Sequence, residues 1–243
     1  MSGGAERPCG TLYLIPVGLA DTPWPGFLPA DTQRIAAGIE HFVVENARAA
    51  RGHLKQLDFP RPLRDTDIRE LPDDADTATL DTLLAPALDG KALGLMSDAG
   101  CPAVADPGSR LVARAHERGI RVAPLVGPSS ILLGLMGSGL NGQSFAFHGY
   151  LPVAETERDA RLRQLEDESR RLGRTQLFIE TPYRNERLFD ALLRQCQPAT
   201  RLCIACDLTG ADEYVLTRRI ADWRRAERPP IAKRPALFLL LAG

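Results

Sequence analysis

The sequence contains no long hydrophobic run. Its longest apolar stretch, residues 235–242, is far shorter than the roughly 20 residues that a helix needs to span a bilayer. The first nine residues also lack the basic and then apolar order of a signal peptide, because charged and small residues come before the first apolar stretch. We therefore expect no membrane helix and a cytoplasmic location.

An excess of charge of either sign is also missing. The 30 Lys and Arg residues are balanced by 31 Asp and Glu residues, which gives a formal net charge of −1. A strongly basic chain is typical of proteins that coat nucleic acid. Any contact of this protein with nucleic acid must therefore be local.

Cysteine is too sparse and too scattered for a disulfide framework. The chain has five cysteines, an odd number, in 243 residues. Cys203 and Cys206 have CxxC spacing, but they lie in an apolar, strand-like run, in which residues three apart point to opposite faces. They are expected to be core thiols. Because there is no second CxxC and no pair of histidines with metal-ligand spacing, no metal site is expected.

What the sequence does have is the composition of a folded protein, with 44% hydrophobic and 25% charged residues. In the first half, short β-rich runs alternate with helical patterns. This alternation predicts an α/β domain with a mostly parallel open sheet, which binds ligands at the carboxyl ends of its strands. The predicted strands are 11–17, 42–45, 67–71, 92–96 and 120–126, and the predicted helices are 47–57, 75–88, 107–119 and an amphipathic segment around Ile35, Ala36, Ile39 and Phe42.

The second half has a different pattern. Its last strand-like runs are separated by short turns, which predicts hairpin-like antiparallel pairing and a mixed sheet. We therefore expect two α/β domains, residues 8–126 and residues 127–243. The predicted strands here are 144–150, 175–180, 201–208, 213–216 and 236–241, and the predicted helices are 131–136, 155–172 and 185–196.

The most informative loop is SDAGCPAVADPG, residues 97–108, which follows a buried strand. Its small residues would let a ligand approach the main chain, and Asp98 could bind that ligand or simply make a turn. Asp106, followed by Pro107, is expected to cap the next helix. Cys101 is a poor candidate for a nucleophile, because nothing near it in the sequence would lower its pKa.

Three further loops carry polar groups or glycine at strand ends. Ser129 or Ser130 is expected to cap a helix whose free N–H groups would suit a carboxylate. Pro16 and Gly18 end the first strand, and Glu180 ends a strand in the second half. By contrast, GSGLNG at 137–142 has the GxGxxG spacing of a dinucleotide site but follows a helix and precedes a strand, so it is expected to be a turn.

Five of these segments, taken in order, resemble the tetrapyrrole methylase family. Within that family they are most similar to the bacterial small-subunit ribosomal RNA 2′-O-methyltransferases, whose pattern contains SDAGTP, DPG, PGPSA, GFLP and ESPHR. The resemblance covers nearly the whole chain. The segments are TLYLIPVG (11–18), SDAGCPAVADPG (97–108), VGPSS (126–130), FHGYLP (147–152) and IETPYR (179–184).

The resemblance implies an enzyme that transfers a methyl group from S-adenosylmethionine, bound in a cleft between the two domains, without a metal. It also implies a homodimer. A carboxylate would act as base or orient a ribose hydroxyl, with Glu180 and Glu45 as candidates beside Asp207, and Arg184 would bind a phosphate. The residues predicted to bind the donor are Pro16, Gly18, Asp98, Ala99, Gly100, Pro102, Val104, Ser129 and Ser130.

The chain also departs from the ribosomal RNA enzymes. They have Glu-Asp-Thr-Arg where this chain has Glu45-Asn46-Ala47-Arg48, and they continue beyond the position of Gly243. The chain therefore resembles a shorter paralogue, whose partner would be ribosomal RNA or an assembled small ribosomal subunit. The alternatives are a methyltransferase that acts on a tetrapyrrole or another small molecule, and a non-catalytic module that binds an adenosine compound.

Overall fold

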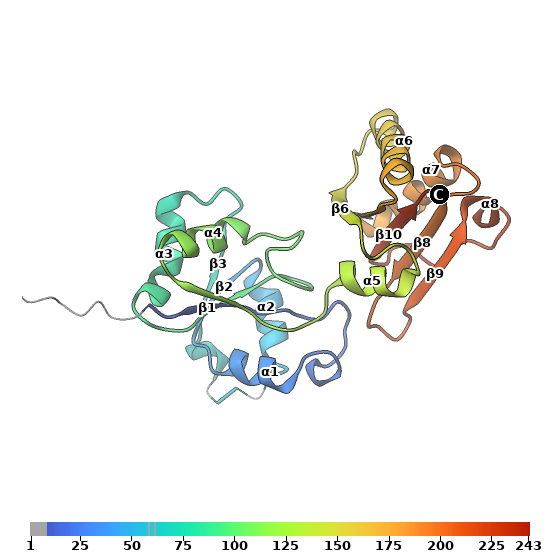
Figure 1. Ribbon diagram of the computed structural model, residues 1–243. Helices are drawn as coiled ribbons and strands as arrows, with labels where there is room; N and C mark the ends of the chain where they lie inside the picture. Colours follow the sequence, from blue (N-terminus) through green and yellow to red (C-terminus); the bar gives the residue numbers. More distant parts are fainter. Residues whose placement is uncertain (1–8, 58, 61) are drawn as a thin grey trace, which may run out of the picture. The chain divides into compact units, whose positions relative to one another are not determined.

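A computed structural model describes residues 9–57, 59–60 and 62–243. The chain divides after Pro128 into two compact units, which we describe separately (Figure 1). Residues 1–8, which include the predicted start of the first domain and most of the stretch that lacks a signal-peptide pattern, lie outside the described part. No helix among the described residues is long and apolar enough to cross a membrane.

The first unit contains a five-stranded parallel sheet in the order β3-β2-β4-β1-β5. The chain leaves β1 toward one edge of the sheet and leaves β4 toward the other, so the strand order reverses between these two neighbours. In open α/β sheets, ligands bind outside the carboxyl ends of the strands at such a point. The strands are β1 (Thr11–Leu14), β2 (His41–Val44), β3 (Asp67–Glu70), β4 (Leu93–Met96) and β5 (Arg121–Pro124).

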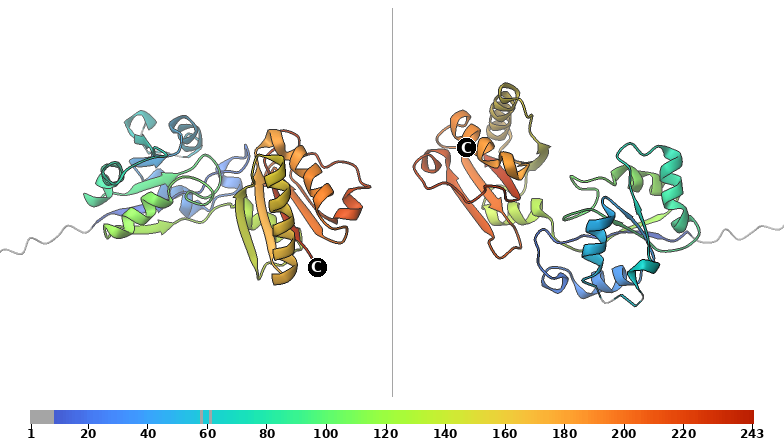
Figure 2. Two further views of the ribbon diagram at one scale, coloured as in Figure 1. Left: turned by 90° about the horizontal axis from the view of Figure 1, so that it is seen from above. Right: turned by 180° about the vertical axis from the view of Figure 1, so that it is seen from behind.

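Helices cover both faces of this sheet (Figure 2). On one face, α1 (Ala30–Ala37) and α2 (Ala47–Leu54) contribute Ala36, Ala50 and Leu54 to a core around Phe42. On the other, α3 (Thr77–Leu88) and α4 (Ser109–Glu117) pack against Leu12, Val43 and Leu93, among others. The predicted helical segment that included Phe42 is wrong at its end, because α1 stops at Ala37 and Phe42 belongs to β2.

The second unit contains a mixed five-stranded sheet in the order β6-β7-β10-β8-β9. Only β6 and β7 are parallel, and the other neighbours pair antiparallel, with β8 and β9 forming a hairpin. The central strand β10 is buried along its whole length. The strands are β6 (Phe145–Tyr150), β7 (Thr175–Glu180), β8 (Arg201–Cys206), β9 (Tyr214–Arg219) and β10 (Ala236–Leu241).

Here too the helices lie on both faces of the sheet. α6 (Glu155–Leu172), α7 (Asn185–Gln195) and α8 (Ile220–Trp223) share a core with Phe178, Ile204 and Phe238. The opposite face is covered by α5 (Ser130–Ser138), which is packed against β8, β9 and β10. The predicted pair of α/β domains, one with a parallel sheet and one with a mixed sheet, is confirmed.

Two smaller predictions concern the second unit. The 137–142 segment is the expected helix-to-strand turn, since α5 ends at Ser138 and Gly139 adopts the left-handed conformation before β6. Cys203 and Cys206 are buried in β8. Burial raises the pKa of the Cys206 thiol to about 11, so it stays protonated at neutral pH.

Candidate functional site

Three loops meet at the carboxyl edge of the first unit's sheet. The loop after β1 is joined to the loop after β4 by a hydrogen bond of 2.9 Å, in which the Val17 N–H donates to the Gly100 carbonyl. The loop after β5 lies against both. A Cβ at Gly127 would come within 2.3 Å of the Pro16 Cβ, and the Cys101 thiol lies 3.3 Å from the Pro128 carbonyl oxygen. Glycine at position 127 therefore makes this close approach possible.

The loop at 97–108 has an unusual backbone. Ala103 and Ala105 have φ values of 65° and 64°, in the left-handed region that residues other than glycine rarely adopt. Gly100 and Gly108 also have positive φ. Backbone strain of this kind persists only where the surrounding structure enforces it, and it is enriched at ligand sites.

The same geometry corrects one prediction. Asp106 does not cap α4, because the helix begins at Ser109 with Gly108 in the capping position. The residues before it follow the positive-φ turn at Ala105, which places the Asp106 carboxylate two residues too early to serve as the cap. Burial, together with the nearby charges of Glu45 and Asp98, instead raises the pKa of Asp106 to about 6.

Side chains from the β2–α2 region form hydrogen bonds with both main-chain polar groups of Asp98, its N–H and its carbonyl. The Glu45 carboxylate accepts a hydrogen bond of 3.1 Å from the Asp98 N–H. His53, on α2, lies with its Nε2 3.0 Å from the Asp98 carbonyl oxygen. Because a carbonyl oxygen can only accept, the His53 Nε2 carries the proton in this contact. Glu45 and His53 therefore fix the loop that begins at Asp98.

A pocket of about 350 Å³ opens beside this loop. A pocket of this size falls within the range of small-molecule sites. The indole Nε1 of Trp24, one of its lining residues, is buried and has no hydrogen-bond partner among the described residues. This donor is therefore unsatisfied in the described structure. The lining residues are Gly18, Leu19, Ala20, Asp21, Thr22, Trp24, Phe27, His53, Gln56, Asp98 and Ala99.

The residues predicted to bind a donor are thus partly brought together. Gly18, Asp98 and Ala99 line the pocket, and Pro16 and Gly100 lie in the loops that form its rim. Pro102 and Val104 are not among the lining residues. Pro102 is buried, and Val104 is 48% exposed.

Ser129 and Ser130 begin the second unit. Ser129 stands at the N-cap of α5, as one of the two predicted alternatives, and its hydroxyl makes no capping hydrogen bond within the described structure. The first N–H groups of a helix have no partner inside the helix. They remain available to an acceptor on a ligand.

The predicted catalytic residues of the second unit bind each other. The Glu180 carboxylate accepts hydrogen bonds from the Thr181 N–H and from the Arg184 guanidinium, with an Nη2 to Oε1 distance of 2.6 Å. The Glu180 side chain is only 3% exposed. Asp207 is likewise paired, with Arg234 at 2.5 Å. These carboxylates are held in structural ion pairs.

Trp24, His53 and Gln56 are pocket residues that the sequence analysis did not single out. Trp24 lies in the Pro-rich loop after β1, which contains Pro23, Pro25 and Pro29. His53 and Gln56 are three apart on and just beyond α2, and this spacing puts both on one side of the helix. The spacing indicates that His53 and Gln56 share one side of the helix. It does not indicate that His53 contacts Asp98, which is 45 residues away in the sequence.

Comparison with known proteins agrees with the motifs. A "Ribosomal RNA small subunit methyltransferase I" from Mesorhizobium japonicum is 37% identical over 151 residues, which are 61% of this chain and 50% of that protein. Its namesake from Xylella fastidiosa is 31% identical over 212 residues, 87% of this chain and 73% of that protein. The chain thus spans half of the first relative's length and about three quarters of the second's.

The fold has counterparts among solved structures. The crystal structure of the methyltransferase CobJ superposes with a TM-score of 0.61, at 16% identity, over 98% of this chain and 95% of that one. Residues 11–223 match the family described as Tetrapyrrole (Corrin/Porphyrin) Methylases. The chain therefore belongs to the tetrapyrrole methylase family of S-adenosylmethionine-dependent methyltransferases.

Proposed function

We propose that the protein transfers a methyl group from S-adenosylmethionine to a ribose 2′-hydroxyl of small-subunit ribosomal RNA. The observation that carries this proposal is the similarity along 87% of the chain to a protein named as a small-subunit ribosomal RNA methyltransferase. The likeness to the methyltransferase CobJ, at 16% identity, supports the fold alone.

The pocket of the first unit has the chemistry to hold the donor. S-adenosylmethionine supplies a methyl group on a positively charged sulfur. Asp98, which lines the pocket, provides negative charge for that cation and its ammonium group, and Asp106 lies close enough to Asp98 to interact with its charge. Gly18, Ala99 and Gly100 would let the ligand approach the main chain. Pro16, Ser129 and Ser130 belong to the same proposal.

The role of the protein in methyl transfer is chiefly alignment of the two reactants and exclusion of water. The proton of the attacking hydroxyl must leave, and a positioned carboxylate can accept it. Among the predicted catalytic residues, Glu45 belongs to the acidic group at the strand ends, whereas the Glu180 carboxylate is neutralised by Arg184. We therefore propose Glu45 as the proton acceptor, and Glu180 with Arg184 as a positioning pair.

The test is a deletion strain in which ribose methylation across the small-subunit RNA is mapped by mass spectrometry. We expect one methyl group to be lost and to return with the wild-type gene but not with an Asp98→Ala copy. In parallel, purified protein is incubated with radiolabelled S-adenosylmethionine and either small ribosomal subunits or uroporphyrinogen. An unchanged methylation map would contradict the RNA proposal.

The parallel assay separates the two alternatives. Label on uroporphyrinogen alone would indicate a tetrapyrrole substrate. Binding of S-adenosylhomocysteine without transfer to either substrate would indicate a non-catalytic module. The predicted homodimer belongs to the same proposal, and light scattering coupled to size-exclusion chromatography tests it.

A further inference from the structure

Two arginines face each other across the edge of the second unit's sheet. In the β8–β9 ladder, Arg201 pairs directly with Arg219. Side chains of directly opposed residues lie on the same face of the sheet, and like charges in this position destabilise it. Both arginines are exposed, and neither has an ion-pair partner among the described residues. The sequence thus keeps a repulsive pair where a neutral pair would be more stable.

A third arginine in the hairpin is held in a fixed position. The Arg218 guanidinium carbon lies 5.2 Å from the centroid of the Trp223 ring. That ring is itself fixed, because it is 2% exposed and its Nε1 donates to the Leu202 carbonyl at 2.9 Å. Cation–π stacking leaves the edge of a guanidinium free to donate hydrogen bonds. Arg218 is therefore a preoriented donor.

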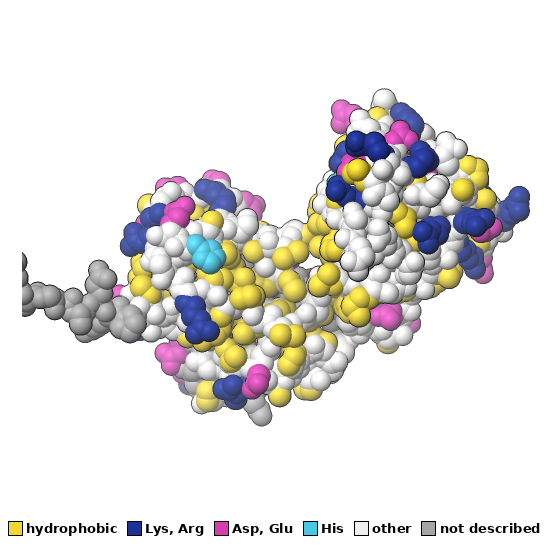
Figure 3. Space-filling model, in the orientation of Figure 1, with side chains coloured by type: hydrophobic (Ala, Val, Ile, Leu, Met, Phe, Trp, Pro, Cys, Tyr) yellow, Lys and Arg dark blue, Asp and Glu magenta, His cyan; other side chains and the backbone are white. Residues whose placement is uncertain are grey.

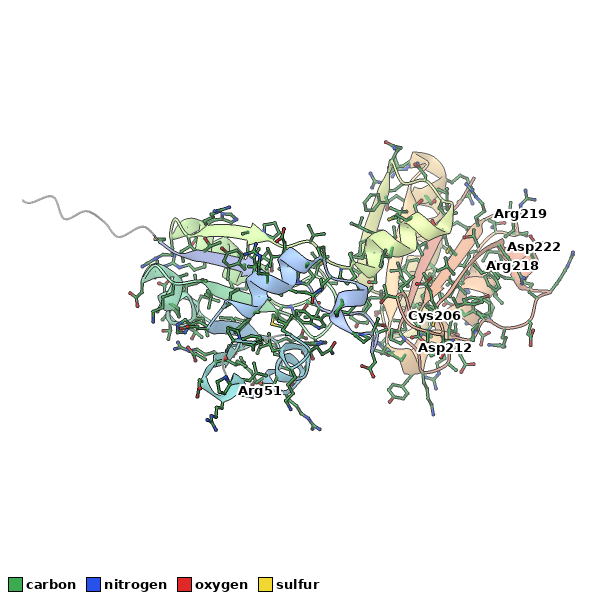
Figure 4. All side chains as sticks on the ribbon, turned by 90° about the horizontal axis from the view of Figure 1, so that it is seen from below. Arg51, Cys206, Asp212, Arg218, Arg219 and Asp222 are labelled. Atoms are coloured by element: carbon green, nitrogen blue, oxygen red, sulfur yellow. The ribbon has the colours of Figure 1, made fainter. Side chains whose placement is uncertain are left out.

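A further arginine without an ion pair follows β9 in the sequence. Arg225, just after α8, is exposed and has no ion-pair partner within the described chain. Arg218 and Arg219 lie close to Asp222 of α8 in Figure 4, and Lys and Arg side chains, with Asp and Glu side chains among them, lie over β9 and α8 in Figure 3. The acidic residues of the hairpin lie at its other end, in and around the turn between β8 and β9. They are Asp207, Asp212 and Glu213.

Several other arginines of the unit form ion pairs. Residues 129–243 contain 17 Lys and Arg and 14 Asp and Glu, so enough acidic groups exist to pair most of the arginines. The paired arginines include Arg184 with Glu180, Arg194 with Glu155, Arg228 with Asp190 and Arg234 with Asp207. Arg171 and Arg187 are also exposed without an ion-pair partner in the described structure, so the feature that sets the β9 end apart is the direct cross-strand pairing of Arg201 with Arg219.

We propose that Arg201, Arg218, Arg219 and Arg225 form a surface that binds the phosphate backbone of RNA, and we call it the β9 arginine surface. This inference rests on the proposed function, which requires RNA contact from a chain with no net positive charge. Guanidinium groups bind phosphate oxygens in a bidentate manner. Arg201 and Arg219 lie side by side on one face of the sheet, and Arg218, the neighbour of Arg219 in the edge strand β9, points to the other face. A polyanion that runs along this edge with its repeated phosphates can contact arginines on both faces, and binding would reduce the repulsion between Arg201 and Arg219.

The test compares two double variants that each remove two positive charges. Arg201→Gln with Arg219→Gln changes the β9 arginine surface. Arg171→Gln with Arg187→Gln is the matched control, because both residues are exposed arginines of the same unit without an ion-pair partner in the described structure. Filter binding measures the affinity for purified small-subunit ribosomal RNA at several salt concentrations. The affinity for S-adenosylhomocysteine and the melting temperature serve as controls for folding.

We expect the β9 double variant to bind RNA about tenfold more weakly and the control variant less than twofold more weakly. The slope of log K against log salt should fall by about 1.4 in the β9 variant, since each lost contact to a single strand removes about 0.7. Its melting temperature should stay the same or rise, because a like-charge pair has been removed. A loss of RNA affinity caused by unfolding would instead lower it.

The outcomes distinguish this inference from the proposed function. Equal RNA affinity of wild type and the β9 variant would overturn the inference, while methyl transfer to ribosomal RNA would still support the function. The arginines would then serve only to keep an edge strand from pairing with another chain. Binding of wild type to phosphatidylserine vesicles but not to RNA would also overturn it. Failure of wild type to methylate ribosomal RNA would count against the function.

Discussion

In the first unit, three carboxylates gather at the carboxyl edge of a parallel sheet, whereas in the second unit most buried carboxylates are matched by arginines. Residues 1–128 hold 17 Asp and Glu against 13 Lys and Arg, and residues 129–243 hold 14 against 17. A net charge near zero for the whole chain hides this division. The difference suits two ligands of opposite charge, a small cation for the first unit and a polyanion for the second.

The difference between the two units would extend to their stability if each unit unfolds in a transition of its own. We propose that residues 8–126 and 127–243 are separate folding domains. Gly127 stands at this boundary and packs against Pro16 of the first unit. Gly127→Val should then abolish the first unit's transition, because the added Cβ would lie 2.3 Å from the Pro16 Cβ and the loops could not close. We expect a loss of more than about 3 kcal/mol, as for other severe overpacking. Differential scanning calorimetry measures the two transitions.

Gly142→Ala is the control for this variant, because a Cβ at Gly142 would meet no atom within 4 Å. It should leave both transitions in place. A single transition that shifts as a whole in Gly127→Val would show that the two units unfold together.

A second prediction concerns whether Glu180 is structural. Arg184→Met should leave a buried carboxylate without its partner and destabilise the second unit by about 2–3 kcal/mol, within the usual range for breaking such a pair after allowance for the partly exposed arginine. Adding Glu180→Gln should recover part of this loss. Urea unfolding of the two single variants and the double variant measures the coupling. If the single variants leave the free energy of unfolding unchanged but abolish transfer, Glu180 is catalytic.

The third prediction distinguishes the contribution of the Asp98 side chain to ligand binding from that of the Asp98 main chain. His53→Ala removes the donor to the Asp98 carbonyl and should weaken binding of S-adenosylhomocysteine about tenfold, because the loop loses one of its two supports. Asp98→Ala keeps both main-chain hydrogen bonds and should also weaken binding, without a change in stability. Isothermal titration calorimetry measures both affinities.

His116→Ala, at an exposed position on α4, is the matched control for His53→Ala and should change the affinity less than twofold. An equal loss of affinity in this control would show that the His53 contact has no special role.

The smallest expected effect concerns pH. The pKa of Asp106 is raised in the folded protein to about 6, above the 3.8 of a free side chain. Folding therefore favours the protonated form, so stability is greatest below the unfolded pKa and falls as pH rises through about 6. Asp106→Asn should stabilise the first unit by about 1 kcal/mol at pH 7.5, after discounting for solvent, and by nothing at pH 4. Urea midpoints at the two pH values measure this, and an equal gain at both would exclude a titration effect.

The sequence analysis predicted the fold well because its signals were local. α6 and β7 begin and end where their patterns predicted, at Glu155–Leu172 and Thr175–Glu180. The parallel sheet followed from the regular alternation of strands and helices. Asp106 was misassigned because the choice of cap depends on the backbone of the whole preceding loop, in which Ala103 and Ala105 adopt positive φ.

The site was harder to predict because its contacts are long-range. The hydrogen bond between His53 and Asp98 joins two separate elements, and no sequence pattern links them. The pairing of Glu180 with Arg184 was readable, since the residues are four apart at the junction of a strand and a short helix. The sequence does not show that the two side chains bind each other and not a substrate, because that depends on the burial of Glu180 in the folded unit.

The position of β10 also governs when the second unit can fold during synthesis. β10 comes after all the other strands in the sequence but lies in the middle of its sheet, between β7 and β8. Until it emerges from the ribosome, β7 lacks its antiparallel neighbour and the β8–β9 hairpin has nothing to join. The first unit has all its strands by Pro124. At roughly 5–20 residues per second, the second unit follows it by on the order of ten seconds, during which a chaperone could bind the unpaired strands.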